Sequence, residues 1–222
     1  MLKEKINDLK RDLVEFATLV EHMIEKSIKG LLEKKRDLLV EVIEENEPKA
    51  NTLELELDEL CITLIAQFEP KAKDLRIILM CSKMCSDLER MGDHAVNIAE
   101  SSLFVIERPL VKPLLDIPRM AEITIKMLKD STDAFINEDV VLARNVCERD
   151  NMVDDLKDQN LRELINFMSS DTSTIERSLH LLRISGNLER IADLSTNICE
   201  EIIFMTKGKV IKHHKSDGKE EN

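Results

Sequence analysis

Residues 88–100 read Leu-Glu-Arg-Met-Gly-Asp-His-Ala-Val-Asn-Ile-Ala-Glu, and residues 188–200 read Leu-Glu-Arg-Ile-Ala-Asp-Leu-Ser-Thr-Asn-Ile-Cys-Glu. Seven of these thirteen positions are identical at a separation of 100 residues. Chance agreement in a helix-rich composition would give about one identity. Apolar residues in both stretches recur at three- and four-residue intervals, which is the period of an amphipathic helix. The chain therefore contains two copies of one helical unit.

The composition of the 222-residue chain favours long helices over strands. Gly and Pro number five each, aromatic residues make up 3%, and Trp and Tyr are absent. Sheet proteins need many turns, and their strands favour aromatic and β-branched residues. Because hydrophobic residues still account for 43% of the chain, we expect helices that pack on aliphatic side chains.

Interruptions in the apolar pattern divide the chain into six expected helices, three on either side of a proline-marked linker. Their approximate ranges are 5–32, 37–67, 74–107, 118–135, 139–168 and 175–207. We predict an all-α fold of two tandem three-helix bundles related by internal duplication. The expected parts are a first repeat at 1–108, a linker at 109–117, a second repeat at 118–207 and a polar, disordered tail at 208–222.

Charge and cysteine content exclude several classes of protein. The net charge is −12, and the body of the chain has no basic patch, which argues against a nucleic-acid partner. The five cysteines are odd in number and lack paired zinc spacing, so we interpret them as buried thiols. No apolar stretch reaches 18 residues. We therefore expect a soluble, cytoplasmic protein.

Both copies of the repeated helix carry a stripe of acidic residues. Glu89 and Asp93 are four residues apart, as are Glu189 and Asp193, and this spacing places each pair on one helix face. Like charges at this spacing repel each other. A single such pair commonly lies on a solvated surface, but its duplication favours a bound cation such as Mg²⁺, Mn²⁺ or iron.

Antiparallel hairpins predict which residues lie opposite these acids, because positions equidistant from the loop face each other. Glu47 and Asn51 are expected opposite Glu89 and Asp93, and Asp150 and Asp154 opposite Glu189 and Asp193. These eight residues are the predicted metal ligands.

The sequence also ranks the two sites and sets their limits. The neutral Asn51 and the helix-breaking Pro48 weaken the first site, so the second is expected to bind more tightly. Glu54 and Asp58 are placed outside the site, at about 7 Å from its level.

No Gly-rich phosphate loop, nucleophile elbow or Cys/His catalytic pair occurs in the sequence. We therefore expect neither an enzyme nor an organic cofactor.

The sequence resembles the PhoU family of phosphate-signalling accessory proteins. The resemblance covers the chain from about Leu9 to Lys207. Its specific motifs are Leu-Glu-Arg-Met-Gly-Asp at 88–93, Asn-Leu-Glu-Arg-Ile-Ala-Asp at 187–193, Glu-Pro-Lys-Ala-Lys-Asp-Leu-Arg at 69–76 and Asp-Asn-Met-Val-Asp at 150–154. It implies two three-helix bundles related by a pseudo-twofold axis. It also implies iron or zinc clusters at the eight predicted ligands, from whose pattern Asn51 departs.

The functional role follows from the resemblance alone. It implies a negative regulator of the phosphate-starvation response that links the ATPase subunit of a phosphate ABC transporter to a membrane sensor histidine kinase. We also expect a homodimer that associates only peripherally with membrane complexes.

Two alternatives remain open on the sequence alone. A ferritin-like carboxylate metal protein would use Glu-x-x-His pairs in a four-helix core, and no such pair occurs in the sequence. A purely structural helical scaffold would use the acids only for solvation, and metal analysis of the purified protein would distinguish it.

Overall fold

A computed structural model describes residues 1–207, and within them all regular structure is helical. The helices are α1 (Leu2–Glu33), α2 (Arg36–Glu41), α3 (Glu47–Phe68), α4 (Lys73–Ile106), α5 (Asp116–Asn137), α6 (Val140–Ser170) and α7 (Ile175–Lys207). A π-helical segment, η1 (Val42–Asn46), joins α2 to α3, and a 3₁₀ turn, η2 (Thr172–Thr174), precedes α7. The tail predicted at 208–222 lies outside the described residues.

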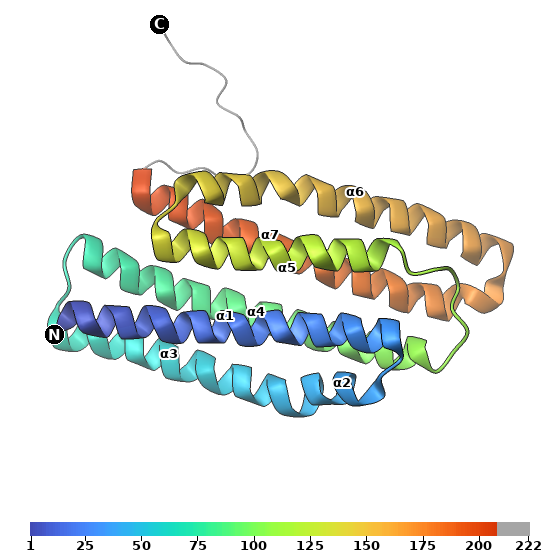
Figure 1. Cartoon of the computed structure of the whole chain (residues 1–222), viewed down its shortest axis with the longest axis horizontal. Coiled ribbons are helices and arrows are strands. Elements are labelled where there is room, and N and C mark those ends of the chain that lie inside the picture. The colour runs from blue at the N-terminus through green and yellow to red at the C-terminus, as the bar shows by residue number, and fades with distance from the viewer. Residues whose placement is uncertain (208–222) are drawn as a thin grey trace, which may run out of the picture.

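The helices form two three-helix bundles, which confirms the predicted fold (Figure 1). Helices α1, α3 and α4 pack together in the first bundle, and α5, α6 and α7 pack together in the second. The bundles meet where α4 contacts α7 and α1 contacts α5. Each of these contacts joins equivalent helices of the two repeats, as a pseudo-twofold arrangement requires.

The apolar side chains of the duplicated stretch are buried in both copies. Leu88 and Leu188 are fully buried, and so are Met91 and its counterpart Ile191. These side chains follow the helical apolar period and turn one face of α4 and of α7 toward the core. The opposite face of each helix stays closer to solvent, and the acidic stripe lies there, at the edge of each hairpin.

The second expected helix is interrupted by a π turn. Pro48 lies in the first turn of α3, where its missing backbone N–H is tolerated. Just before it, the Glu47 N–H donates to the Val42 carbonyl five residues earlier, which is the π-helical pattern. The π turn also places Asn46 in the interior, where its Oδ1 accepts a hydrogen bond from Lys26 Nζ at 3.2 Å. The proline therefore accompanies a local change to π-helical backbone, and this segment still contacts α1 through Asn46 and Lys26.

The turn before α6 has a side-chain cap. Asp139 Oδ1 accepts hydrogen bonds from the backbone N–H groups of Val141 at 2.9 Å and Leu142 at 3.0 Å. An aspartate at this position satisfies backbone donors that the first helical turn leaves free. The cap fixes where α6 begins and thereby helps to set the level of its acidic residues.

Candidate metal centres

Two polar contacts fix the register of α6 against α7. Lys157 Nζ donates to Glu189 Oε1 at 2.8 Å, and Asn160 Nδ2 donates to Ser185 Oγ at 3.1 Å. Because the helices are antiparallel, a residue three positions before Lys157 lies level with one three positions after Glu189. Asp154 therefore lies level with a residue between Glu189 and Asp193.

Three carboxylates gather at this level and form what we call the second cluster: Asp154, Glu189 and Asp193. Partial burial, followed by the charge of Glu189, raises the pKa of both Asp154 and Asp193. Two cations oppose this crowding, because the charges of Lys157 and Arg190 lower the pKa of Asp193, and Lys157 also lowers that of Asp154. Arg190 Nη1 lies 3.6 Å from Asp193 Oδ2. The second cluster thus contains its own counter-charges.

Asp150, the fourth predicted ligand of the second site, occupies a different environment. Its side chain is buried, with 8% of its surface exposed. Asp150 and Glu200 both lie near Cys147, where their charges act on the thiol. Asp150 is one helical turn from Asp154, on the side away from Glu189. The structure therefore brings three of the four predicted residues together at one level.

The first cluster lies in the α3/α4 hairpin and consists of Glu47, Glu54, Glu89 and Asp93. Partial burial raises the pKa of Glu89, and the charges of Asp93, Glu54 and Glu47 raise it further, in that order. Within residues 1–207, none of these four carboxylates forms an ion pair. Asn51 is exposed to solvent.

Glu54, which was expected outside the site, lies close enough to Glu89 for its charge to raise the pKa of that carboxyl. Ser82 Oγ donates to Asp58 Oδ1 at 2.7 Å across the hairpin, and Glu54 lies one turn from Asp58 toward Glu89. The charge of Glu54 acts on Glu89 more strongly than that of Glu47 does. Its match to Asp154 at a separation of 100 residues was the signal that could have identified it.

The two clusters differ in what they offer a cation. Within the described residues, no group of three or more His, Cys, Asp or Glu side chains is already arranged around a metal position. The donor sets are nevertheless carboxylate oxygens, which suit hard cations. The four carboxylates of the first cluster form no ion pair among the described residues, although the charge of Arg90 lowers the pKa of Glu89. In the second cluster, Lys157 and Arg190 form ion pairs with Glu189 and Asp193. The ion pairs of the second cluster favour metal binding at the first, whereas the neutral Asn51 favours the second, so the order of the two sites stays a prediction.

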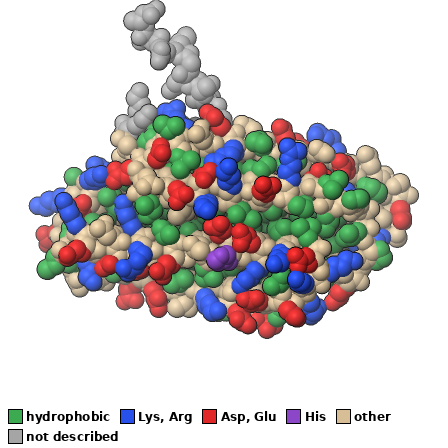
Figure 2. All heavy atoms as spheres, in the orientation of Figure 1, with side chains coloured by type: hydrophobic (Ala, Val, Ile, Leu, Met, Phe, Trp, Pro, Cys, Tyr) green, Lys and Arg blue, Asp and Glu red, His purple; other side chains and the backbone are tan. Residues whose placement is uncertain are grey.

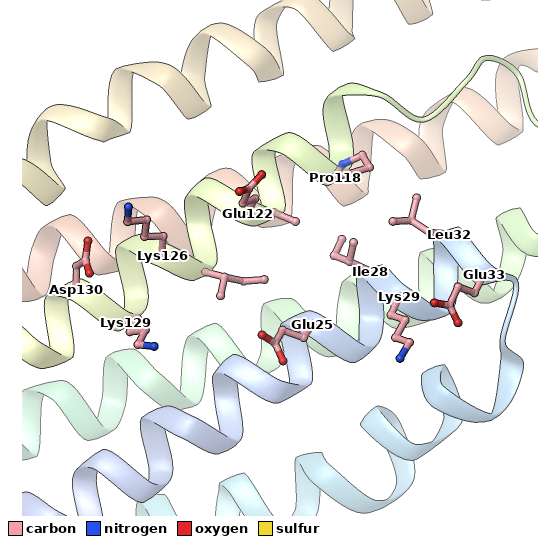
Figure 3. Close-up of a pocket in the computed structure, with 12 residues that line it drawn as sticks. Glu25, Ile28, Lys29, Leu32, Glu33, Pro118, Glu122, Lys126, Lys129 and Asp130 are labelled. Atoms are coloured by element: carbon pink, nitrogen blue, oxygen red, sulfur yellow. The ribbon is translucent and has the colours of Figure 1, made fainter.

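A groove between the bundles is separate from both clusters. It has a volume of about 670 Å³ and lies between α1 and α5 (Figure 3). Ile28 and Leu32 of α1 and Pro118 of α5 line its apolar part, and charged side chains border it. Figure 2 shows hydrophobic side chains exposed along the same seam, among acidic and basic ones. No residue of either acidic cluster lines this groove.

A helix that crosses a membrane needs both length and an apolar surface. In residues 1–207, none combines sufficient length with sufficient apolar character to do so.

Comparisons with known proteins agree with the repeat, the bundles and the position of the acidic helices. The PhoU domain model matches residues 13–102 and again residues 117–202. The phosphate-specific transport system accessory protein PhoU homolog of Aquifex aeolicus is 37% identical over 212 residues, which cover 96% of each chain. The Escherichia coli accessory protein PhoU is 31% identical over 94% of this chain and 86% of its own.

A solved structure shows the same architecture. The crystal structure of PhoU from Pseudomonas aeruginosa superposes with a TM-score of 0.90 at 30% identity, and the match covers 94% of this chain and 100% of that one. Both repeats and nearly the whole length are therefore accounted for by one family. The chain belongs to the PhoU family.

Proposed function

We propose that this chain is a non-catalytic accessory protein of a phosphate transport system and a negative regulator of phosphate-starvation signalling. The observation that carries the proposal is the match of the PhoU domain model to both repeats. It is supported by relatives named as accessory proteins of phosphate-specific transport, at up to 37% identity over nearly the full chain. The chain would act as an adaptor at the cytoplasmic side of the membrane.

The proposed mechanism is selective binding of partner conformations. As a homodimer, the chain would contact the ATPase subunit of a phosphate ABC transporter and a membrane sensor histidine kinase. An adaptor shifts a partner's equilibrium only if it binds one conformation better than another. A tenfold preference corresponds to about 1.4 kcal/mol, which a few contacts along a helix face can supply.

We further propose that the acidic clusters hold metal ions such as iron, zinc, magnesium or manganese. Glu47, Glu54, Glu89 and Asp93 would supply the ligands in the first cluster, and Asp154, Glu189 and Asp193 those in the second. The cation would neutralise carboxylates whose partial burial and crowding already raise the pKa of Glu89 and Asp193. Asp150 and Asn51 are the remaining members of the predicted ligand sets.

The metal proposal is tested by elemental analysis of the purified chain and of two double variants. We expect Glu54→Gln with Glu89→Gln to remove more metal than Asp154→Asn with Asp193→Asn, because ion pairs from Lys157 and Arg190 already hold Glu189 and Asp193 in the second cluster. Unchanged metal content in both double variants would contradict the assignment of these ligands.

The adaptor proposal is tested by affinity capture. Tagged full-length chain would be recovered with membranes from cells grown in high phosphate, and bound proteins would be identified by mass spectrometry. We expect enrichment of the phosphate-transporter ATPase subunit and of a sensor histidine kinase over a tag-only control. Capture of neither protein, in high or in low phosphate, would contradict the proposal.

A further inference from the structure

Two of the five cysteines face each other across the α6/α7 hairpin. Cys147 lies ten residues before Lys157, and Cys199 lies ten residues after Glu189. Since Lys157 and Glu189 are paired at 2.8 Å, the antiparallel register places the two cysteines at the same level. Each thiol also shifts the pKa of the other as a hydrogen-bonding neighbour, which requires the two side chains to lie close together.

The pair is not required by the repeated fold. At the corresponding positions 100 residues earlier, the first repeat has Glu47 and Ala99. The first bundle therefore forms with no thiol at either position. The juxtaposition of Cys147 and Cys199 is a property of the second repeat alone.

The two thiols also differ in their access to solvent. Cys147 is half-buried at the edge of the hairpin, whereas Cys199 is fully buried beneath it. A small oxidant can thus reach the Cys147 sulfur, whereas the Cys199 sulfur is shielded from solvent. This order of access is typical of a reactive cysteine with a neighbouring resolving cysteine.

From this geometry we propose that Cys147 and Cys199 form an intramolecular disulfide when the chain encounters a hydroperoxide. The disulfide would tie α6 to α7 two helical turns from Asp154 and so stiffen the hairpin that holds the second cluster. The inference does not depend on the adaptor function.

The chemistry proceeds in two balanced steps. The Cys147 thiolate attacks one peroxide oxygen, the O–O bond breaks, and the leaving oxygen takes a proton to become water or an alcohol. Cys147 is thereby oxidised by two electrons to a sulfenic acid. Cys199 then loses its proton and attacks that sulfur, the S–O bond breaks, and the departing hydroxide takes the proton and leaves as water.

The environment of the pair supports this assignment of roles. Hydrogen bonding with Cys199 lowers the pKa of Cys147, despite partial burial and the charges of Glu200 and Asp150, which act in the opposite direction. The same interaction, together with burial, raises the pKa of Cys199. Cys147 is therefore the thiol that reacts first, because the thiolate is the nucleophile.

The other three cysteines provide an internal control. Cys61, Cys81 and Cys85 are buried together between α3 and α4. Burial raises the pKa of Cys61 and of Cys81 to about 12 and also raises that of Cys85. These thiols remain protonated at neutral pH and have no exposed member, so peroxide should spare them.

The test uses the full-length, reduced chain treated with increasing hydrogen peroxide and then with iodoacetamide. Peptide mass spectrometry without reduction should show a linked Cys147–Cys199 pair that disappears after dithiothreitol. Cys147→Ser and Cys199→Ser should each abolish the linked pair, whereas the triple variant Cys61→Ser, Cys81→Ser and Cys85→Ser should retain it. Circular dichroism would establish that each variant is folded.

Two results would overturn the proposal. One is oxidation of Cys147 to sulfinic acid while Cys199 in the same molecules remains reduced and is alkylated after unfolding. The other is a disulfide between two chains, seen as a dimer on a non-reducing gel that Cys147→Ser removes. Either result would show that Cys199 does not resolve the oxidised Cys147.

Discussion

Replacement of Asp87 by Asn should stabilise the protein at neutral pH. Asp87 lies on α4 where that helix meets α7, and burial raises the pKa of its carboxyl from 3.8 to about 6. The charge of Glu201 raises this pKa further, while Arg90 and Lys83 act in the opposite direction. The second repeat already has Asn187 at the position 100 residues later, so an amide is compatible with this fold.

The magnitude follows from the pKa difference. One pKa unit corresponds to about 1.4 kcal/mol, so the shift from 3.8 to about 6 gives an upper limit of roughly 3 kcal/mol. The side chain is 21% exposed, and Arg90 Nη1 lies 3.6 Å from its Oδ1. Solvent screening and the lost contact with Arg90 reduce the expected gain from Asp87→Asn to about 1–2 kcal/mol.

The sign depends on pH in a defined way. Between pH 3.8 and about 6 the folded chain binds the Asp87 proton more tightly than the unfolded chain does. The contribution of this group to stability therefore falls as pH rises through that window, and the full cost is present above about pH 6. Asp87→Asn should be most stabilising near pH 7.5 and nearly neutral near pH 4.

Urea unfolding at pH 7.5 and pH 4 measures both effects. In thermal unfolding of a chain of this length, the same gain should raise the melting temperature at pH 7.5 by about 2–8 °C. Asp155→Asn on the exposed face of α6 is the matched control and should change stability little at either pH. A loss of stability in Asp87→Asn at pH 7.5, or an equal gain at both pH values, would refute the reasoning.

Two glycine substitutions within helices should have opposite effects, and mutation of the first cluster should relieve charge repulsion. In Gly30→Ala the new Cβ would lie 2.5 Å from Cδ2 of the buried Leu39, so we expect a loss of about 1–3 kcal/mol in urea unfolding. Gly186→Ala meets no atom within 4 Å and should gain about 1 kcal/mol from helix propensity; a loss in that variant would show that the glycine has another role. Glu89→Gln without added metal should stabilise the chain at neutral pH, because the raised pKa of Glu89 marks an unfavourable charge; a lower melting temperature at that pH would contradict this interpretation.

The fold could be predicted because its signals are local. Leu88 and Ile98, with their counterparts Leu188 and Ile198, follow the helical period, and all four are buried. A repeated apolar face defines a helix and its core side without knowledge of the rest of the chain. The scarcity of turn-forming residues then left few arrangements other than helical bundles.

The acidic clusters were less predictable because they depend on register between helices. The 3₁₀ turn at Thr172–Thr174 lies between α6 and α7 and shifts the level of α6 by about three residues from the expected hairpin. That shift places Asp150 beyond the level of Asp193 and brings Asp154 level with the space between Glu189 and Asp193. The counter-charge of Lys157 depends on the same register.

Sequence patterns could not predict the position of the π turn either. Pro48 indicated a bend or break, but its neighbours Glu47 and Lys49 do not specify how the backbone adapts. The structure relieves the missing N–H by a five-residue turn at Val42–Asn46. This solution depends on Asn46 reaching Lys26 on α1, a contact between residues distant in sequence.

The central claim is that this chain represses phosphate-starvation signalling, and a reporter measurement tests it most directly. A phosphate-starvation promoter would be assayed at high external phosphate in a strain lacking this gene and any second copy. We predict high reporter activity in that strain, and repression on return of the full chain or of a chain ending at Lys207. Normal repression without the gene would contradict the account.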